Sequence, residues 1–230
     1  MSLEVCVFGD SIAKGVIFDS IKGRYIFLKN NITDILNNRL GLKIDNYAKF
    51  GCTIQAGKKI IEKHLPKLAR YKYTALEFGG NDCDFDWAAI SERPDDEHLP
   101  KTPIDSFEEI YSEVIDTVAK SGSTPVLVSL PPLNAPRYFS WITRGLNAEN
   151  ILKWLGDIEH IYRWHEMYNL AVLKLAAIKK VPLIDVRKAF LKVRDYTRLY
   201  CEDGIHPNEE GHRLISNIII EYISKLSPSA

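Results

Sequence analysis

The chain has 230 residues, of which 46% are apolar and 26% charged, and its 30 basic side chains balance its 30 acidic ones. This composition is typical of a globular protein, and the length suits one domain with a sizeable core. A net charge of zero provides no basic field for nucleic acid or an anionic membrane, so a small neutral partner is expected. No run reaches the roughly 18 apolar residues of a membrane span, and no signal-peptide pattern is found, so a cytoplasmic location is expected.

Short apolar runs alternate along the chain with longer segments of helical periodicity. The runs expected as strands are Glu4–Gly9, Lys43–Ala48, Thr74–Phe78, Thr124–Leu130 and Val181–Val186. They lack strict polar alternation, which is typical of strands buried on both faces. The clearest helical segments are Ile54–Leu68, Ser106–Ala119 and a last helix that starts at Pro207. We therefore expect an α/β fold with a parallel sheet covered on both faces by helices.

Two connections are longer than an α/β domain needs, Cys83–Asp105 and Pro131–His165. Connections of this length usually cover a site or decorate the surface. In the second, Tyr138 and Trp141 are candidates for lining an acyl or sugar pocket, and the underside of a lid is the alternative. His165 falls on an apolar helical stripe and is expected to be a core or lid histidine.

The triplet Gly9-Asp10-Ser11 directly follows the first expected strand. A serine at a sharp turn between a strand and a helix stands clear of the sheet, where it can act as a nucleophile. Backbone N–H groups at the start of that helix can bind an anion. Taken alone, the triplet is better explained by an ordinary helix cap.

The segment Asp203-Gly204-Ile205-His206-Pro207 stands immediately before the last expected helix. An acid three residues before a histidine can hold one ring nitrogen through a turn, which leaves the other nitrogen available for proton transfer. A turn aspartate and a helix-capping histidine are the structural alternative.

Possible oxyanion donors follow two further strands. Asn81 lies in Gly79-Gly80-Asn81-Asp82 after the third expected strand, and Gly51 follows the second. A side-chain amide and a backbone N–H are donors that can stabilise an oxyanion. A turn rich in Gly and Asn is the alternative for the first segment, and Gly51 alone says little.

The four segments are expected at the carboxyl edge of the sheet, where ligands bind in folds of this kind. Together they contain a nucleophile, a base, an acid that orients the base, and oxyanion donors. This set is complete for acyl transfer, so we interpret the chain as a serine hydrolase.

In these residues the chain resembles the SGNH hydrolases, also called the GDSL lipase/esterase family. Gly9-Asp10-Ser11 matches the first family block, with Ile12 in place of leucine, and the other matches are Gly51, Gly79-x-Asn81-Asp82 and Asp203-x-x-His206-Pro207. The resemblance implies a three-layer α/β/α sandwich, flavodoxin-like, with a five-stranded parallel sheet. It also implies a single domain over residues 1–230 with long insertions at about 83–105 and 131–165.

By the same resemblance, Ser11 is the nucleophile, His206 the general base and then acid, and Asp203 its partner. The N–H groups of Ser11 and Gly51 and the side chain of Asn81 form the implied oxyanion hole. The implied activity is a serine esterase or acylhydrolase that cleaves a small carboxylic ester through an acyl-enzyme. An acyltransferase with the same triad and a non-catalytic binding domain are the alternatives.

No metal or cofactor is expected. Asp82, Asp84 and Asp86 alternate as in a calcium loop, but Trp87 and Arg93 stand where an EF-hand needs Gly and Glu. The four cysteines lack metal or disulfide spacing. Packing is the expected role of Cys52, Cys83 and Cys201, which adjoin the candidate segments, and a metal or redox role is the alternative. The expected partner is a small-molecule ester, without nucleic acid or a membrane span, and the oligomeric state is left open.

Overall fold

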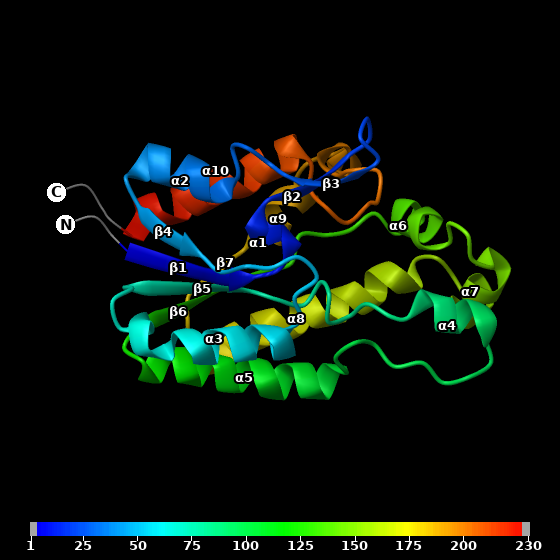
Figure 1. Ribbon diagram of the computed structural model, residues 1–230, viewed down its shortest axis with the longest axis horizontal. Coiled ribbons are helices and arrows are strands. Elements are labelled where there is room, and N and C mark those ends of the chain that lie inside the picture. Colours follow the sequence, from blue (N-terminus) through cyan, green and yellow to red (C-terminus); the bar gives the residue numbers. More distant parts are fainter. Residues whose placement is uncertain (1–3, 227–230) are drawn as a thin grey trace.

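A computed structural model describes residues 4–226, with a five-stranded sheet at the centre (Figure 1). The strands are β1 (Glu4–Gly9), β4 (Lys43–Asn46), β5 (Tyr73–Glu77), β6 (Thr124–Val128) and β7 (Leu183–Ile184). Their order is β4-β1-β5-β6-β7, and all neighbours are parallel. The predicted fold class is confirmed.

Helices cover both faces of the sheet and give the fold three layers (Figure 1). One face carries α3 (Ile54–Leu68), α5 (Ile104–Lys120) and α8 (His160–Lys179), and the other α2 (Ile32–Leu40), α9 (Val186–Leu191) and α10 (Glu209–Leu226). Strand and helix side chains form an apolar core on each face. Burial on both sides explains why the central strands β1, β5 and β6 are mainly apolar. Within residues 4–226, none of the helices is both long and apolar enough to cross a bilayer.

An antiparallel hairpin that the sequence analysis missed, β2 (Val16–Asp19) and β3 (Arg24–Phe27), lies between α1 (Ser11–Lys14) and α2. Helix α1 ends after one turn because Gly15 adopts a φ of 79°, the left-handed conformation that glycine favours at helix C-termini. The hairpin brings Tyr25 next to the loop that contains Asp203.

The last helix begins at Glu209, and its expected start at Pro207 is wrong. Asn208 caps the helix, since its side chain accepts the N–H groups of Glu210 at 3.0 Å and Gly211 at 3.1 Å. Pro207 instead lies opposite Tyr200 in an isolated β-bridge.

The last strand is shorter than the expected Val181–Val186, because the side chain of Asp185 caps α9 directly after Ile184. Helix α9 and a 3-10 helix, η1 (Tyr196–Leu199), intervene before α10. The segment Asp203–His206 therefore follows η1 and, as expected, stands just before the last helix.

The two long connections fold into helices beyond the carboxyl ends of the strands (Figure 1). They contain α4 (Trp87–Glu92), α6 (Ala135–Ile142), α7 (Ala148–Leu155) and the first residues of α8. Their apolar side chains form a third cluster, apart from the two cores against the sheet. This helical cover lies above the edge where the candidate site residues are expected.

Gly57 in α3 supports a close approach between this helix and the sheet. A methyl group on its Cα would lie 2.4 Å from the ring of Phe78, which is fully buried. Alanine improves helix propensity by about 1 kcal/mol, whereas overpacking a core costs about 1–3 kcal/mol. We predict that Gly57→Ala lowers the free energy of unfolding by about 1–2 kcal/mol in urea denaturation.

The double variant Gly57→Ala/Phe78→Leu provides the control. Its loss of stability should be smaller than the sum of the two single losses, because the smaller side chain relieves the contact. A Gly57→Ala protein more stable than wild type would contradict this account of the packing.

Candidate active site

The first candidate segment forms a tight junction between β1 and α1. Gly9 is required there, because an added Cβ would lie 2.8 Å from the carbonyl oxygen of Glu77. Asp10 is the N-cap of α1, and its Oδ1 accepts the N–H of Ile12 at 2.8 Å. Ser11 is therefore the first residue of the helix, where a backbone N–H has no partner within the helix.

The loop between η1 and α10 holds its own histidine in place. Asp203 Oδ1 accepts the N–H groups of Ile205 at 3.1 Å and His206 at 3.0 Å. Gly204 adopts a φ of 75°, and an added Cβ would lie 2.7 Å from the carbonyl oxygen of Asn134. The turn thus fixes the carboxylate beside the imidazole, and glycine is the residue that its backbone permits.

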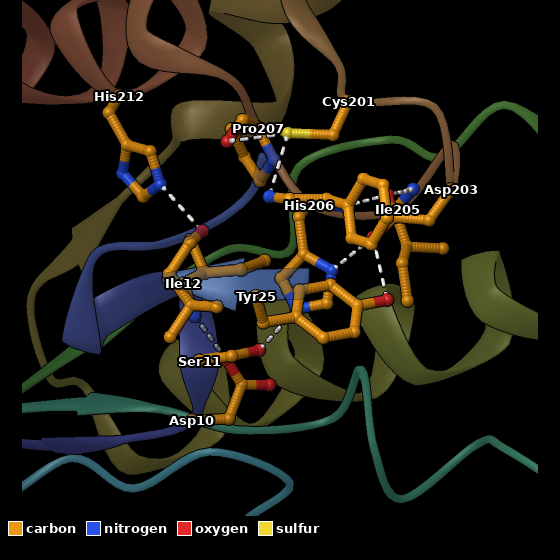
Figure 2. A network of polar contacts seen from close by, with 12 residues as sticks. Asp10, Ser11, Ile12, Tyr25, Cys201, Asp203, Ile205, His206, Pro207 and His212 are labelled. Atoms are coloured by element: carbon orange, nitrogen blue, oxygen red, sulfur yellow. Dashed lines mark hydrogen bonds and ion pairs between the residues drawn. The ribbon is translucent and has the colours of Figure 1, made fainter. Parts of the chain in front are cut away.

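Ser11, His206 and Asp203 form one hydrogen-bonded row (Figure 2). The Oγ of Ser11 lies 2.9 Å from Nε2 of His206, and Nδ1 of His206 lies 2.6 Å from Oδ2 of Asp203. With Nδ1–H donating to the carboxylate, Nε2 is left as the acceptor for the serine hydroxyl. This arrangement can take a proton from Ser11 and stabilise the resulting imidazolium.

The carboxyl group of Asp203 is fully buried, yet its environment favours the ionised form. Burial raises the pKa of Asp203, but hydrogen bonds and charge from His206 and the N–H of Ile205 outweigh it and hold the pKa below its usual range. Tyr25 also donates its hydroxyl to Oδ2 at 3.0 Å. A carboxylate that accepts several hydrogen bonds is the form that can orient and stabilise a histidine.

Aromatic rings enclose His206 on the side of the hairpin. The Tyr25 ring lies 4.9 Å from the His206 ring, and Phe50 is stacked on it at 5.9 Å with an interplanar angle of 7°. The sequence analysis missed both residues, because Tyr25 belongs to the unpredicted hairpin and Phe50 stands in no motif. These rings limit the movement of the imidazole and its contact with water.

The two other candidate oxyanion donors line the same cleft as Ser11 and His206. Asn81 donates one hydrogen of Nδ2 to Oδ2 of Asp10 at 2.8 Å, which leaves the second hydrogen available. Gly51 adopts a φ of 68°, a conformation that favours glycine. The cleft has a volume of about 450 Å³.

The helical cover provides the roof of this cleft. Tyr138 and Trp141 line it, as does His165, for which burial lowers the pKa to about 3 and so favours the neutral ring. The hydroxyl of Tyr138 donates to Asp84 at 2.6 Å, whereas Arg144 packs 3.9 Å from the ring centre of Trp141. Both candidate contact residues are thus held in position by neighbours.

The alternating aspartates do not face a common centre. Asp82 accepts the N–H of Ile54 at 2.9 Å, Asp84 pairs with Lys101 at 2.8 Å, and Asp86 caps α4. Their carboxylates serve three different structural contacts, so the residues do not fit a calcium loop.

The candidate cysteines pack as neutral thiols. Burial raises the pKa of Cys52 and of Cys201 to about 11, and it raises that of Cys83 well above its usual range. A thiol with a raised pKa is a poor nucleophile and metal ligand at neutral pH.

A second acid that the sequence analysis missed lies behind the nucleophile. Glu77 at the end of β5 is 4% exposed, and its Oε2 accepts the N–H of Asp10 at 3.2 Å. Burial and the adjacent Asp10 charge raise the pKa of Glu77 well above its usual range. Two neighbouring buried carboxyl groups cannot readily both ionise, so we infer that Glu77 keeps its proton. The sequence signal that could have predicted this pair is Glu77 itself, an acid at the end of a mainly apolar strand.

The sign of the pH effect follows from the raised pKa of Glu77. The folded state holds a proton that the unfolded chain loses, so this group's stabilising contribution falls as the pH rises above the usual glutamate range. Glu77→Gln keeps a neutral donor at every pH. We predict that the free energy of unfolding of Glu77→Gln increases relative to wild type as the pH rises from 5 to 9, measured by urea denaturation.

The exposed Glu97 provides a matched control, since Glu97→Gln should leave the pH dependence of wild type in place. Parallel curves for Glu77→Gln and wild type would show that Glu77 does not hold a proton in the folded protein.

The structural comparisons agree with this fold. A lipase/acylhydrolase from Enterococcus faecalis superposes with a TM-score of 0.68 at 17% identity, covering 99% of each chain. LAE5, an alpha/beta hydrolase from the metagenome of Lake Arreo, superposes with a TM-score of 0.68 at 18% identity, covering 99% of this chain and 98% of the other. The esterase EstA from Pseudoalteromonas, whose structure was determined with the inhibitor monoethylphosphonate, superposes with a TM-score of 0.63 at 13% identity, with 97% of each chain covered.

Sequence comparison identifies the family. No curated protein matches the chain significantly. The model of the GDSL-like lipase/acylhydrolase family matches residues 7–214, which include all four candidate segments. The chain belongs to the GDSL-like lipase/acylhydrolase family, and it is a hydrolase of the ester type.

Proposed function

We propose that the protein is a serine esterase that cleaves a small carboxylic ester through an acyl-enzyme on Ser11. The observation that supports this proposal most directly is the 2.9 Å contact between Ser11 Oγ and His206 Nε2, with Asp203 bound to the other ring nitrogen. A hydroxyl is a weak nucleophile by itself, and a base positioned at this distance activates it.

In the first half of the proposed reaction, Ser11 Oγ attacks the ester carbonyl while its proton passes to Nε2 of His206. The carbonyl oxygen becomes an oxyanion, which the N–H groups of Ser11 and Gly51 and the free hydrogen of Asn81 Nδ2 would stabilise. His206 then gives the proton to the departing alcohol oxygen, and the acyl group stays on Ser11.

In the second half, a water molecule loses its proton to Nε2 and attacks the acyl-enzyme. The second tetrahedral intermediate uses the same donors, and its collapse returns the proton to Ser11 and releases the acid. Asp203 keeps Nδ1 protonated throughout and stabilises the imidazolium in both halves.

We predict that the protein hydrolyses p-nitrophenyl esters in a panel from acetate to octanoate. Ser11→Ala should lower kcat by about 10⁴-fold or more, because no other group replaces the nucleophile. The surface variant Ser224→Ala is the matched control and should hydrolyse the panel as wild type does. A Ser11→Ala protein with undiminished activity would exclude the proposed mechanism, and slow hydrolysis with fast transfer to an added alcohol would favour an acyltransferase.

Asn81→Ala tests the proposed oxyanion hole separately. We expect kcat to fall about 100–1,000-fold with a smaller change in KM, because the donor acts mainly on charge that develops in the transition state. Steady-state kinetics on the best ester of the panel would measure both constants. Asn30→Ala, on the exposed surface, is the control, and wild-type kcat for Asn81→Ala would remove Asn81 from the mechanism.

A further inference from the structure

A second hollow lies beside the active-site cleft, and Phe50 lines both. Its volume is about 430 Å³. Three of its lining residues are lysines, namely Lys14, Lys49 and Lys63, and aromatic side chains contribute to its walls. This basic hollow is a feature of a chain whose net charge is zero.

The positive charge of the basic hollow is not neutralised by the protein. No acidic residue lines it, and within residues 4–226 none of its three lysines forms an ion pair. The active-site cleft differs, since Lys101 there is paired with Asp84 at 2.8 Å. Like charges that share one hollow repel each other, so an anion that entered it would be stabilised by all three.

The basic hollow is built on the same segments as the catalytic groups. Lys14 is the last residue of α1, whose first residue is Ser11, and Lys49 stands two positions before Gly51. The N–H of Lys49 donates to the carbonyl oxygen of Gly9 at 3.0 Å, which ties this loop to β1. The backbones of Lys14 and Lys49 are therefore held at fixed positions relative to the nucleophile.

The location of the basic hollow indicates that it would contact the alcohol part of the ester rather than the acyl part. In the proposed mechanism Nε2 of His206 protonates the departing alcohol, so the alcohol part leaves from the Nε2 edge of the His206 ring. Phe50 is stacked on that ring at 5.9 Å and separates it from the basic hollow. An alcohol that extends past Phe50 would reach Lys14, Lys49 and Lys63.

We propose that the basic hollow is a subsite for a phosphate or similar anionic group carried by the alcohol part of the ester. Three ammonium groups suit the several oxygens of a phosphate, and charge-assisted hydrogen bonds are the stronger class of such bonds. Phe27 and Tyr47, which also line the hollow, can pack against the carbon skeleton that joins the phosphate to the ester. This inference rests on the proposed esterase function and narrows its substrate class.

The test compares two soluble esters that differ only in the phosphate, 1-butyrylglycerol and 1-butyrylglycerol 3-phosphate. Binding is measured by calorimetry on Ser11→Ala, so the readout does not depend on turnover. We expect the phosphate ester to bind at least about tenfold more tightly in 20 mM salt, with a smaller difference at 0.5 M salt because of screening. In the triple variant Lys14→Gln/Lys49→Gln/Lys63→Gln, the two esters should bind equally.

A triple change of lysines outside the basic hollow, Lys120→Gln/Lys188→Gln/Lys192→Gln, is the matched control. It removes the same net charge and should keep both the preference and the activity of wild type. Because two lysines lie in catalytic segments, the single variant Lys63→Glu on α3 provides a second measurement. It should weaken binding of the phosphate ester more than that of the neutral ester, even if the triple variant does not fold.

Equal binding of the two esters to Ser11→Ala, or a preference that survives in the triple variant, would overturn the inference. Inorganic phosphate is tested alongside: if it changes the rate on the neutral ester while no preference for the phosphate ester exists, free phosphate is the ligand and the substrate subsite is excluded. A wild-type protein that binds the phosphate ester selectively but hydrolyses neither compound would contradict the esterase proposal alone.

Discussion

The buried contact between Asp203 and His206 is the interaction on which the rest of the site depends. A carboxylate with no exposure to water is costly unless its charge is met by hydrogen bonds. The backbone of its own turn, the imidazole and the Tyr25 hydroxyl supply these bonds. The same contacts fix which ring nitrogen carries a proton, so the stability of the loop and the proposed chemistry of His206 have a common cause.

A second layer of buried acids supports the other half of the site. Asp10 caps the helix that begins with Ser11 and also accepts a hydrogen bond from Asn81, so one carboxyl group positions the nucleophile and a proposed oxyanion donor. Glu77 lies behind it as a neutral partner. Removing Asp10 would therefore disturb both groups together, which is expected of residues that act as a unit.

The residues that sequence analysis found are those whose signal is local. The β1 and α3 bounds agree with the expected ranges because both have a clear apolar pattern, and Thr53 caps α3. Asn81 directly follows a glycine, and Ser11 and His206 each stand two positions after one. Tyr25 was not predicted because its partner, Asp203, is 178 positions away in the sequence. Glu77 was not predicted because the role of a buried acid can be assigned only when its neighbour on the adjacent strand segment, Asp10, is known. The start of α10 was missed because Asn208 and Pro207 are both residues that favour a helix N-terminus, and Asn208 is the one that caps it.

The central claim is that Ser11 is a nucleophile activated by His206. Its most direct measurement is mass spectrometry of the protein after treatment with a fluorophosphonate, followed by mapping of the modified peptide. The account predicts one phosphonyl group on Ser11 in wild type and strongly reduced labelling in His206→Ala at equal folded concentration. A folded wild-type protein that stays unmodified, or one that is modified at another residue while Ser11 stays free, would contradict it.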